Sequence, residues 1–76
     1  MTNRNIAVIG AGYWGKNLVR NFYQIGVLKT ICDGEQSTLK QMSLTYPEVQ
    51  VSDNTDAVLN DGEIEGVVIA APAVMN

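Results

Sequence analysis

The chain has 76 residues, of which 46% are hydrophobic and 17% charged, and its formal net charge at pH 7 is −3. This length argues for one domain at most. The five basic residues are scattered rather than clustered, so nucleic acid is not an expected partner. With one cysteine and no histidine, the chain cannot form an internal disulfide and is a poor candidate for a zinc site.

The sequence also argues against a membrane protein and against a secreted protein. No stretch approaches the roughly 20 apolar residues of a membrane-spanning helix, so no membrane association is expected. The first apolar run is broken by Gly10, too early for the hydrophobic region of a secretory signal. Cys32 lies inside an apolar run and is expected to be a buried thiol. We therefore expect a cytoplasmic protein.

The hydrophobic pattern alternates between strand and helix periods. In chain order it predicts a strand over residues 5–9, a helix over 13–25, a strand over 27–32, a helix over 35–46, a strand over 49–51, a helix over 55–60 and a strand over 66–71. Gly26 and Pro47 are expected to stop the first two helices, and residues 53–55 to form the turn and cap before the third. The helix side chains expected in the core are Leu18, Phe22, Ile25, Leu39, Met42 and Leu59.

A glycine-rich turn follows the first predicted strand, with Gly10, Gly12 and Gly15 in the spacing G-x-G-x-x-G. In a dinucleotide-binding turn, the first glycine permits the tight turn and the second lets a pyrophosphate approach the backbone. The third lets the next helix pack close to the strand. The phosphates then lie at the helix N-terminus, where unpaired N–H groups and the dipole favour negative charge. The alternative is a glycine-rich turn that binds no ligand.

Two aromatic residues occupy variable positions of this turn. The backbone N–H groups of Tyr13 and Trp14 are expected to face the pyrophosphate, with their rings lining the nicotinamide side of the cleft. The alternative is that Trp14 packs at a domain interface. Lys16 and Arg20 lie one helical turn apart and either form a solvated helix face, which we favour, or contact phosphates of the substrate.

Asp33 ends the second predicted strand, 21 positions after Gly12. This is close to the ~20-residue offset at which an acidic residue binds the adenosine ribose. A carboxylate there can accept hydrogen bonds from both ribose hydroxyls of NAD and would repel the 2′-phosphate of NADP, and no arginine occupies positions 34–36. NAD is therefore the expected cofactor. The alternative is that Asp33 only caps the next helix.

Strands that alternate with helices are joined by right-handed crossovers and form a parallel sheet. We predict an α/β fold, a Rossmann-type partial domain with strand order 3-2-1-4 and helices on both faces. The glycine turn and residues 70–72 should then face one crevice. The fourth strand would be a bare edge, although its apolar sequence is typical of a covered strand. We expect residues 1–76 to be a dinucleotide-binding half-domain from a longer protein, or a partner chain to cover this edge.

The sequence resembles the N-terminal part of the glucose–fructose oxidoreductase / inositol dehydrogenase (Gfo/Idh/MocA) family. The resemblance covers residues 5–76 and rests on residues 7–18, 31–33, 61–69 and 70–73. The last segment is similar to the family's Ala-Thr-Pro turn, with Ala71 in place of threonine. The resemblance implies that Ala71, Pro72 and Ala73 lie beside the adenosine and nicotinamide riboses; the alternative is a plain strand end with a proline stop.

The run Gly-Tyr-Trp-Gly, followed by Asn-Leu-Val-Arg-Asn-Phe, is similar to one branch of the family. Members of that branch are nucleotide-sugar 3-dehydrogenases, which oxidise UDP-N-acetylglucosamine or its uronic acid in bacterial surface-polysaccharide pathways. The resemblance implies hydride transfer between a sugar carbon and NAD. It also implies a second domain that holds the sugar, and a Glu-Lys-Pro motif with the catalytic lysine beyond Asn76. Residues 1–76 alone are expected to hold no catalytic residue and to be inactive.

Two other functions remain open at this point. One is a stand-alone module that binds NAD or docks a protein through the open sheet edge, with a homo-oligomer formed across that edge. The other is a different Rossmann enzyme, such as a homoserine- or dihydrodipicolinate-type reductase, which a preference for NADP would favour.

Overall fold

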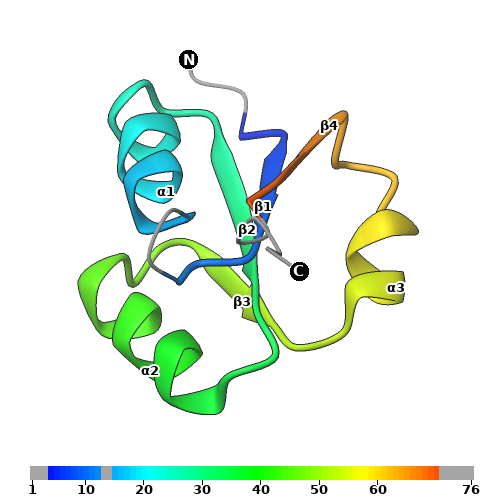
Figure 1. Ribbon diagram of the computed structural model, residues 1–76. Coiled ribbons are helices and arrows are strands. Elements are labelled where there is room, and N and C mark those ends of the chain that lie inside the picture. Colours follow the sequence, from blue (N-terminus) through cyan, green and yellow to red (C-terminus); the bar gives the residue numbers. More distant parts are fainter. Residues whose placement is uncertain (1–3, 13–14, 71–76) are drawn as a thin grey trace, which may run out of the picture.

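The structure is a computed structural model that describes residues 4–12 and 15–70 (Figure 1). All the elements predicted from the sequence are present among these residues, and their bounds agree to within one or two positions. Residues 13–14 of the predicted first helix and residue 71 of the predicted fourth strand lie outside the described residues. Their order is β1 (Ile6–Ile9), α1 (Gly15–Gln24), β2 (Leu28–Cys32), α2 (Gln36–Thr45), β3 (Gln50–Ser52), α3 (Thr55–Leu59) and β4 (Gly66–Ile69).

The strands form one parallel sheet in the order β3-β2-β1-β4, as predicted. β1 lies between β2 and β4, and its last residue, Ile9, is in register with Cys32 on one side and Ile69 on the other. Parallel strands end at the same edge of the sheet, so the segments that follow β1, β2 and β4 meet there. This edge carries the glycine turn.

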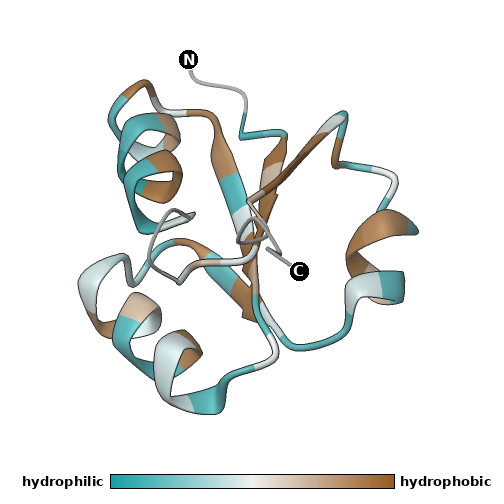
Figure 2. Ribbon diagram, in the orientation of Figure 1, coloured by the Kyte–Doolittle hydropathy of each residue, from teal (hydrophilic) through white to brown (hydrophobic). Residues whose placement is uncertain are grey.

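Helices cover both faces of the sheet: α1 and α2 lie on one side and α3 on the other (Figure 1). Beneath α1 and α2, the core is built around Val8, Val19, Ile31 and Leu39. The smaller core beneath α3 contains Ala7, Cys32 and Val58. Figure 2 shows apolar residues running along β1, between these two layers. The fold is therefore an α/β Rossmann-type partial domain.

Gly26 ends α1 in the way the sequence predicts. Its φ of 81° lies in the left-handed region that favours glycine. The Gly26 N–H donates to the Tyr23 carbonyl at 3.0 Å, and the Val27 N–H donates to the Phe22 carbonyl at 3.2 Å. This pair of bonds forms a Schellman motif, which satisfies two carbonyls at the helix end. The chain then turns directly into β2.

Two predicted core residues are instead exposed. Ile25 is 67% exposed because it follows the last residue of α1 and belongs to the turn that leaves the helix. Leu59 is 57% exposed because the neighbouring Val58 takes the core position of the short helix α3. Consecutive helical side chains are about 100° apart, so both cannot face the sheet. The predictions for Ile25 and Leu59 were wrong, whereas Leu39 is buried and Leu18, Phe22 and Met42 pack against the core.

β4 forms an edge of the sheet within the described part of the chain. It pairs with β1 on one side, and its side chains alternate between half-buried and exposed. Val67 and Ile69 are exposed because α3 packs over β2 rather than over β4. The expectation of an uncovered fourth strand is confirmed for these residues.

Tyr23 and Glu48 connect α1 to the segment before β3. The Tyr23 hydroxyl donates to Glu48 Oε2 at 2.5 Å, and the Tyr23 ring lies 4.5 Å from the Tyr46 ring. The hydrogen bond to the carboxylate favours the neutral phenol, so it raises the pKa of Tyr23. It also stabilises the carboxylate and lowers the pKa of Glu48.

The pKa shifts predict a pH window for this contact. The bond is complete above the ordinary glutamate pKa and below the ordinary tyrosine pKa. It is lost as the pH falls through the lowered pKa of Glu48 or rises through the raised pKa of Tyr23.

Replacing Glu48→Gln should lower the Tyr23 pKa towards its ordinary value, measured by NMR titration of the Tyr23 ring. Asp56→Asn, on the opposite face, is the control and should leave it unchanged. An unchanged Tyr23 pKa in Glu48→Gln would contradict the assignment.

Candidate functional site

The glycine turn begins where β1 ends. Gly10 has a φ of 95°, a conformation that other residues rarely adopt, and its N–H donates to the Cys32 carbonyl at 2.7 Å. The turn therefore leaves β1 sharply while staying bonded to the end of β2. This is the tight turn that the sequence predicts for the first glycine.

Gly15 brings the first turn of α1 against the ends of two strands. A Cβ atom at this position would overlap the carbonyl oxygen of Gly10 and lie 3.3 Å from the Cβ of Ala70. Ala70 itself donates its N–H to the Ile9 carbonyl at 2.8 Å, directly after β4. The close packing predicted for Gly15 is present, and it brings the glycine turn beside the segment after β4.

Gly12 contrasts with Gly15. It is exposed, and an added Cβ would meet nothing within 4 Å. Its carbonyl accepts the Lys16 N–H at 3.0 Å at the start of α1. The absence of a side chain at Gly12 therefore serves no packing need among the described residues, and it leaves the outer side of the backbone open to a ligand.

Asp33 lies at the other side of the turn. Its Oδ2 accepts the Ala11 N–H at 2.7 Å and its Oδ1 accepts the Glu35 N–H at 2.8 Å. The N-cap of α2 is Glu35, which makes no capping bond with its side chain. Asp33 therefore precedes α2 without occupying its N-cap position, so the alternative reading as the helix cap was wrong. The carboxylate is instead bonded to the glycine turn.

Five of the predicted site residues, Tyr13, Trp14, Ala71, Pro72 and Ala73, lie outside the described residues. Of the others, the structure brings Gly10, Gly12, Gly15 and Asp33 to one edge of the sheet. Ala11 was not predicted as a site residue, because it occupies a variable position of the motif and its contact uses only its backbone. The motif spacing alone could not indicate this hydrogen bond.

Several other predictions can be compared with the structure. Cys32 is a free, buried thiol, 1% exposed, as predicted. Lys16 and Arg20 are exposed and line a groove between α1 and α2. Over residues 4–12 and 15–70, no three or more Cys, Asp or Glu side chains are grouped as metal ligands. In the same part of the chain, no helix is long and apolar enough to cross a membrane.

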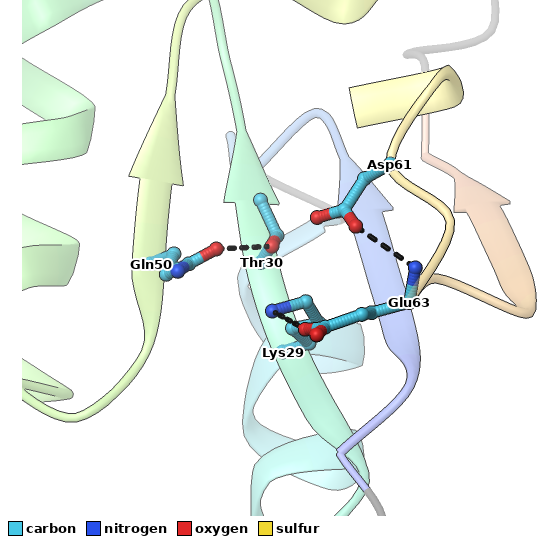
Figure 3. A network of polar contacts seen from close by, with 5 residues as sticks. All are labelled: Lys29, Thr30, Gln50, Asp61 and Glu63. Carbon is cyan, nitrogen blue, oxygen red and sulfur yellow. Dashed lines mark hydrogen bonds and ion pairs between the residues drawn. The ribbon is translucent and has the colours of Figure 1, made fainter. Parts of the chain in front are cut away.

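Two grooves flank β3, away from the glycine turn. The groove on the α3 side has a volume of about 410 Å³, and Thr30, Gln50 and Asp61 contribute polar groups to it. Figure 3 shows the contacts beside it: Thr30 and Gln50 face one another across β2 and β3 at 3.4 Å, and Lys29 pairs with Glu63 at 3.1 Å. These contacts join β2 to β3 and to the segment before β4.

A tight glycine turn at a helix N-terminus, open on one side and joined to an acidic residue after the next strand, is the arrangement that binds dinucleotides. The fold and this edge of the sheet define a Rossmann-type dinucleotide-binding unit. Residues 4–76 match the model of the Gfo/Idh/MocA oxidoreductase family, described as an NAD-binding Rossmann fold. The chain belongs to this family, and its general role is that of a nicotinamide dinucleotide-binding oxidoreductase domain. No curated protein and no solved structure gave a match.

Substitutions of Gly15 and Gly12 should differ in their effect on stability. Gly15→Ala should lower the free energy of unfolding by about 2 kcal/mol or more, because the new methyl group meets backbone atoms that cannot move aside. Gly12→Ala should change it by less than about 0.5 kcal/mol, because its surroundings are open. Urea unfolding followed by circular dichroism measures both values. Equal effects of the two substitutions would show that the packing at Gly15 is not as close as the structure indicates.

Proposed function

We propose that this chain is the NAD-binding part of an oxidoreductase that transfers a hydride between a sugar or nucleotide sugar and the nicotinamide ring. One observation carries the proposal: the Asp33 carboxylate is bonded to a glycine turn whose outer side is open at Gly12. Membership of the oxidoreductase family supports the general role. The substrate class rests on the likeness of residues 12–15 and 17–22 to nucleotide-sugar 3-dehydrogenases.

The residues at this edge fit the parts of the cofactor. The open backbone at Gly12, with the N–H groups of Tyr13 and Trp14, would hold the pyrophosphate at the start of α1, after the tight turn at Gly10. Gly15 allows α1 to begin close enough to the turn for this. Asp33 would accept hydrogen bonds from the adenosine ribose, and Ala71, Pro72 and Ala73 would border the riboses. When bound, the cofactor supplies the hydride acceptor or donor, and the protein supplies binding and orientation.

The charge of Asp33 favours NAD over NADP. Its two oxygens each accept one backbone N–H and each keeps a further lone pair for a ribose hydroxyl. A 2′-phosphate in the same place would bring a second negative charge against the carboxylate. Positions 34–36 contain no arginine to neutralise it.

The substrate-binding domain and the catalytic lysine belong to the proposal as well. We place them in a longer cytoplasmic protein, in which residues 1–76 form the first half of the cofactor domain. A Glu-Lys-Pro sequence in the reading frame beyond Asn76 would support this arrangement. Its absence would favour a module that binds the cofactor without catalysis.

Binding of NAD should raise the melting temperature. At a hundredfold excess over the Kd, a ligand that binds only the folded state adds about 2.7 kcal/mol, which in a domain of this size corresponds to roughly 10 °C or more. Circular dichroism melts with NAD and NADP at equal concentration should show a clearly larger shift for NAD. Melting unaffected by either cofactor would contradict the proposed function.

The variant Gly12→Ala tests whether the NAD-dependent shift in melting temperature arises from binding at the glycine turn. It should melt at the same temperature as the original protein without ligand and lose most of the NAD-dependent shift, because the methyl group occupies the path of the pyrophosphate. Gly62→Ala is the matched control, since Gly62 also has nothing within 4 Å of an added Cβ but lies in the turn between α3 and β4. A full NAD shift in Gly12→Ala would place the cofactor elsewhere.

A further inference from the structure

We propose that Asp33 is a positioning residue for the glycine turn, and that its charge organises this turn before the cofactor binds. The predicted effect on cofactor affinity rests on the proposed function. Its structural part stands on the hydrogen bonds of the cofactor-free protein. Asp33 thus both orders the turn and contributes to cofactor choice.

The Asp33 side chain adds a hydrogen bond between the segments that follow β1 and β2. The last backbone bond across this pair runs from the Gly10 N–H to the Cys32 carbonyl at 2.7 Å. The next N–H along the turn, that of Ala11, donates to Asp33 Oδ2 at 2.7 Å. Consecutive N–H groups of a regular strand point to opposite sides, so it is the turn at Gly10 that brings the Ala11 N–H to the side of β2, where the carboxylate accepts it.

Ala11 needs this acceptor because it is buried. The residue is 2% exposed, and its methyl group belongs to the core cluster that also contains Val8 and Val19. A buried N–H without an acceptor is costly, and a bond to a charged acceptor is stronger than one to a neutral group. The bond therefore holds the backbone between Gly10 and Gly12, the part that the pyrophosphate is proposed to approach.

A side chain of the same size cannot fully replace Asp33, because both of its carboxylate oxygens accept hydrogen bonds. Asp33 Oδ1 accepts the Glu35 N–H at 2.8 Å, so the side chain joins the turn after β1 to the turn after β2. An asparagine has one acceptor oxygen and cannot serve both N–H groups, because its amide nitrogen is a donor. Replacing Asp33 should therefore loosen the glycine turn even where the new side chain has the same size.

This role changes the expected outcome for cofactor choice. If Asp33 acted only by repelling the 2′-phosphate, its removal would improve binding of NADP. If it also positions the turn, its removal weakens the pyrophosphate site that NAD and NADP share. Substitution at position 33 alone should then reduce the affinity for NAD without producing a protein that binds NADP tightly.

The test uses the full chain carrying Asp33→Asn, with Asp33→Ala as a second variant. The matched control is Asp61→Asn: Asp61 Oδ1 accepts the Glu63 N–H at 2.9 Å, the same contact two residues ahead, but Asp61 follows α3 rather than β2. NMR of the cofactor-free protein measures the amide proton shift and hydrogen exchange of Ala11. Titration calorimetry measures the affinities for NAD and NADP.

We expect exchange at Ala11 to become about tenfold faster or more in Asp33→Ala, which has no acceptor, with an upfield shift of its amide proton, and to stay unchanged in Asp61→Asn. Affinity for NAD should fall at least about tenfold, with no gain for NADP beyond that of the original protein. Unchanged exchange and amide shift at Ala11 would overturn the positioning role. So would a variant that binds NADP as tightly as the original protein binds NAD. If the original protein binds neither cofactor, the proposed function fails, while the Ala11 measurements still decide the contact.

Discussion

The parallel pairing of β1 with both β2 and β4 is the constraint on which the site depends. Because the three strands run in the same direction and end in register at Ile9, Cys32 and Ile69, three separate segments of the chain emerge at one edge. The described part of the glycine turn, Asp33 and Ala70 are adjacent for this reason. The chemistry of the edge is then set by what each segment contributes: an open backbone, a carboxylate and a close contact with Gly15.

Much of this arrangement could be predicted because short segments of the sequence contain the signals for it. Strand and helix periods distinguish the elements, and Gly26 and Asn54 mark a helix end and a helix start whose bonds the structure contains. Alternation of strands and helices restricts the topology to a parallel sheet, and the handedness of crossovers restricts it further. The place of Asp33 follows from its position after β2, since the spacing from Gly12 reflects the length of the intervening helix and strand.

What the sequence could not predict depends on side-chain direction and on backbone contacts. Ile25 fits the helical period but lies in the turn that leaves α1, and Leu59 is exposed because its neighbour Val58 takes the core position of the short helix α3. The bond from Ala11 to Asp33 involves a backbone N–H at a variable motif position, so no residue type in the sequence indicates it. The same holds for Thr30 and Gln50, which belong to different strands and become neighbours through the register of β2 and β3.

The structure distinguishes two glycines of the motif, Gly15 and Gly12, by their surroundings. Gly15 lies against the Gly10 carbonyl and Ala70, so it is required for folding whether or not a ligand binds. Gly12 has open surroundings among the described residues, so packing within residues 4–12 and 15–70 does not account for its missing side chain, whereas the proposed approach of a ligand to the backbone would. Asp33 lies between these cases, because its carboxylate is used by the folded protein and still has lone pairs to offer. In the proposed site, a substitution of Asp33 would therefore affect cofactor preference and the conformation of the glycine turn together.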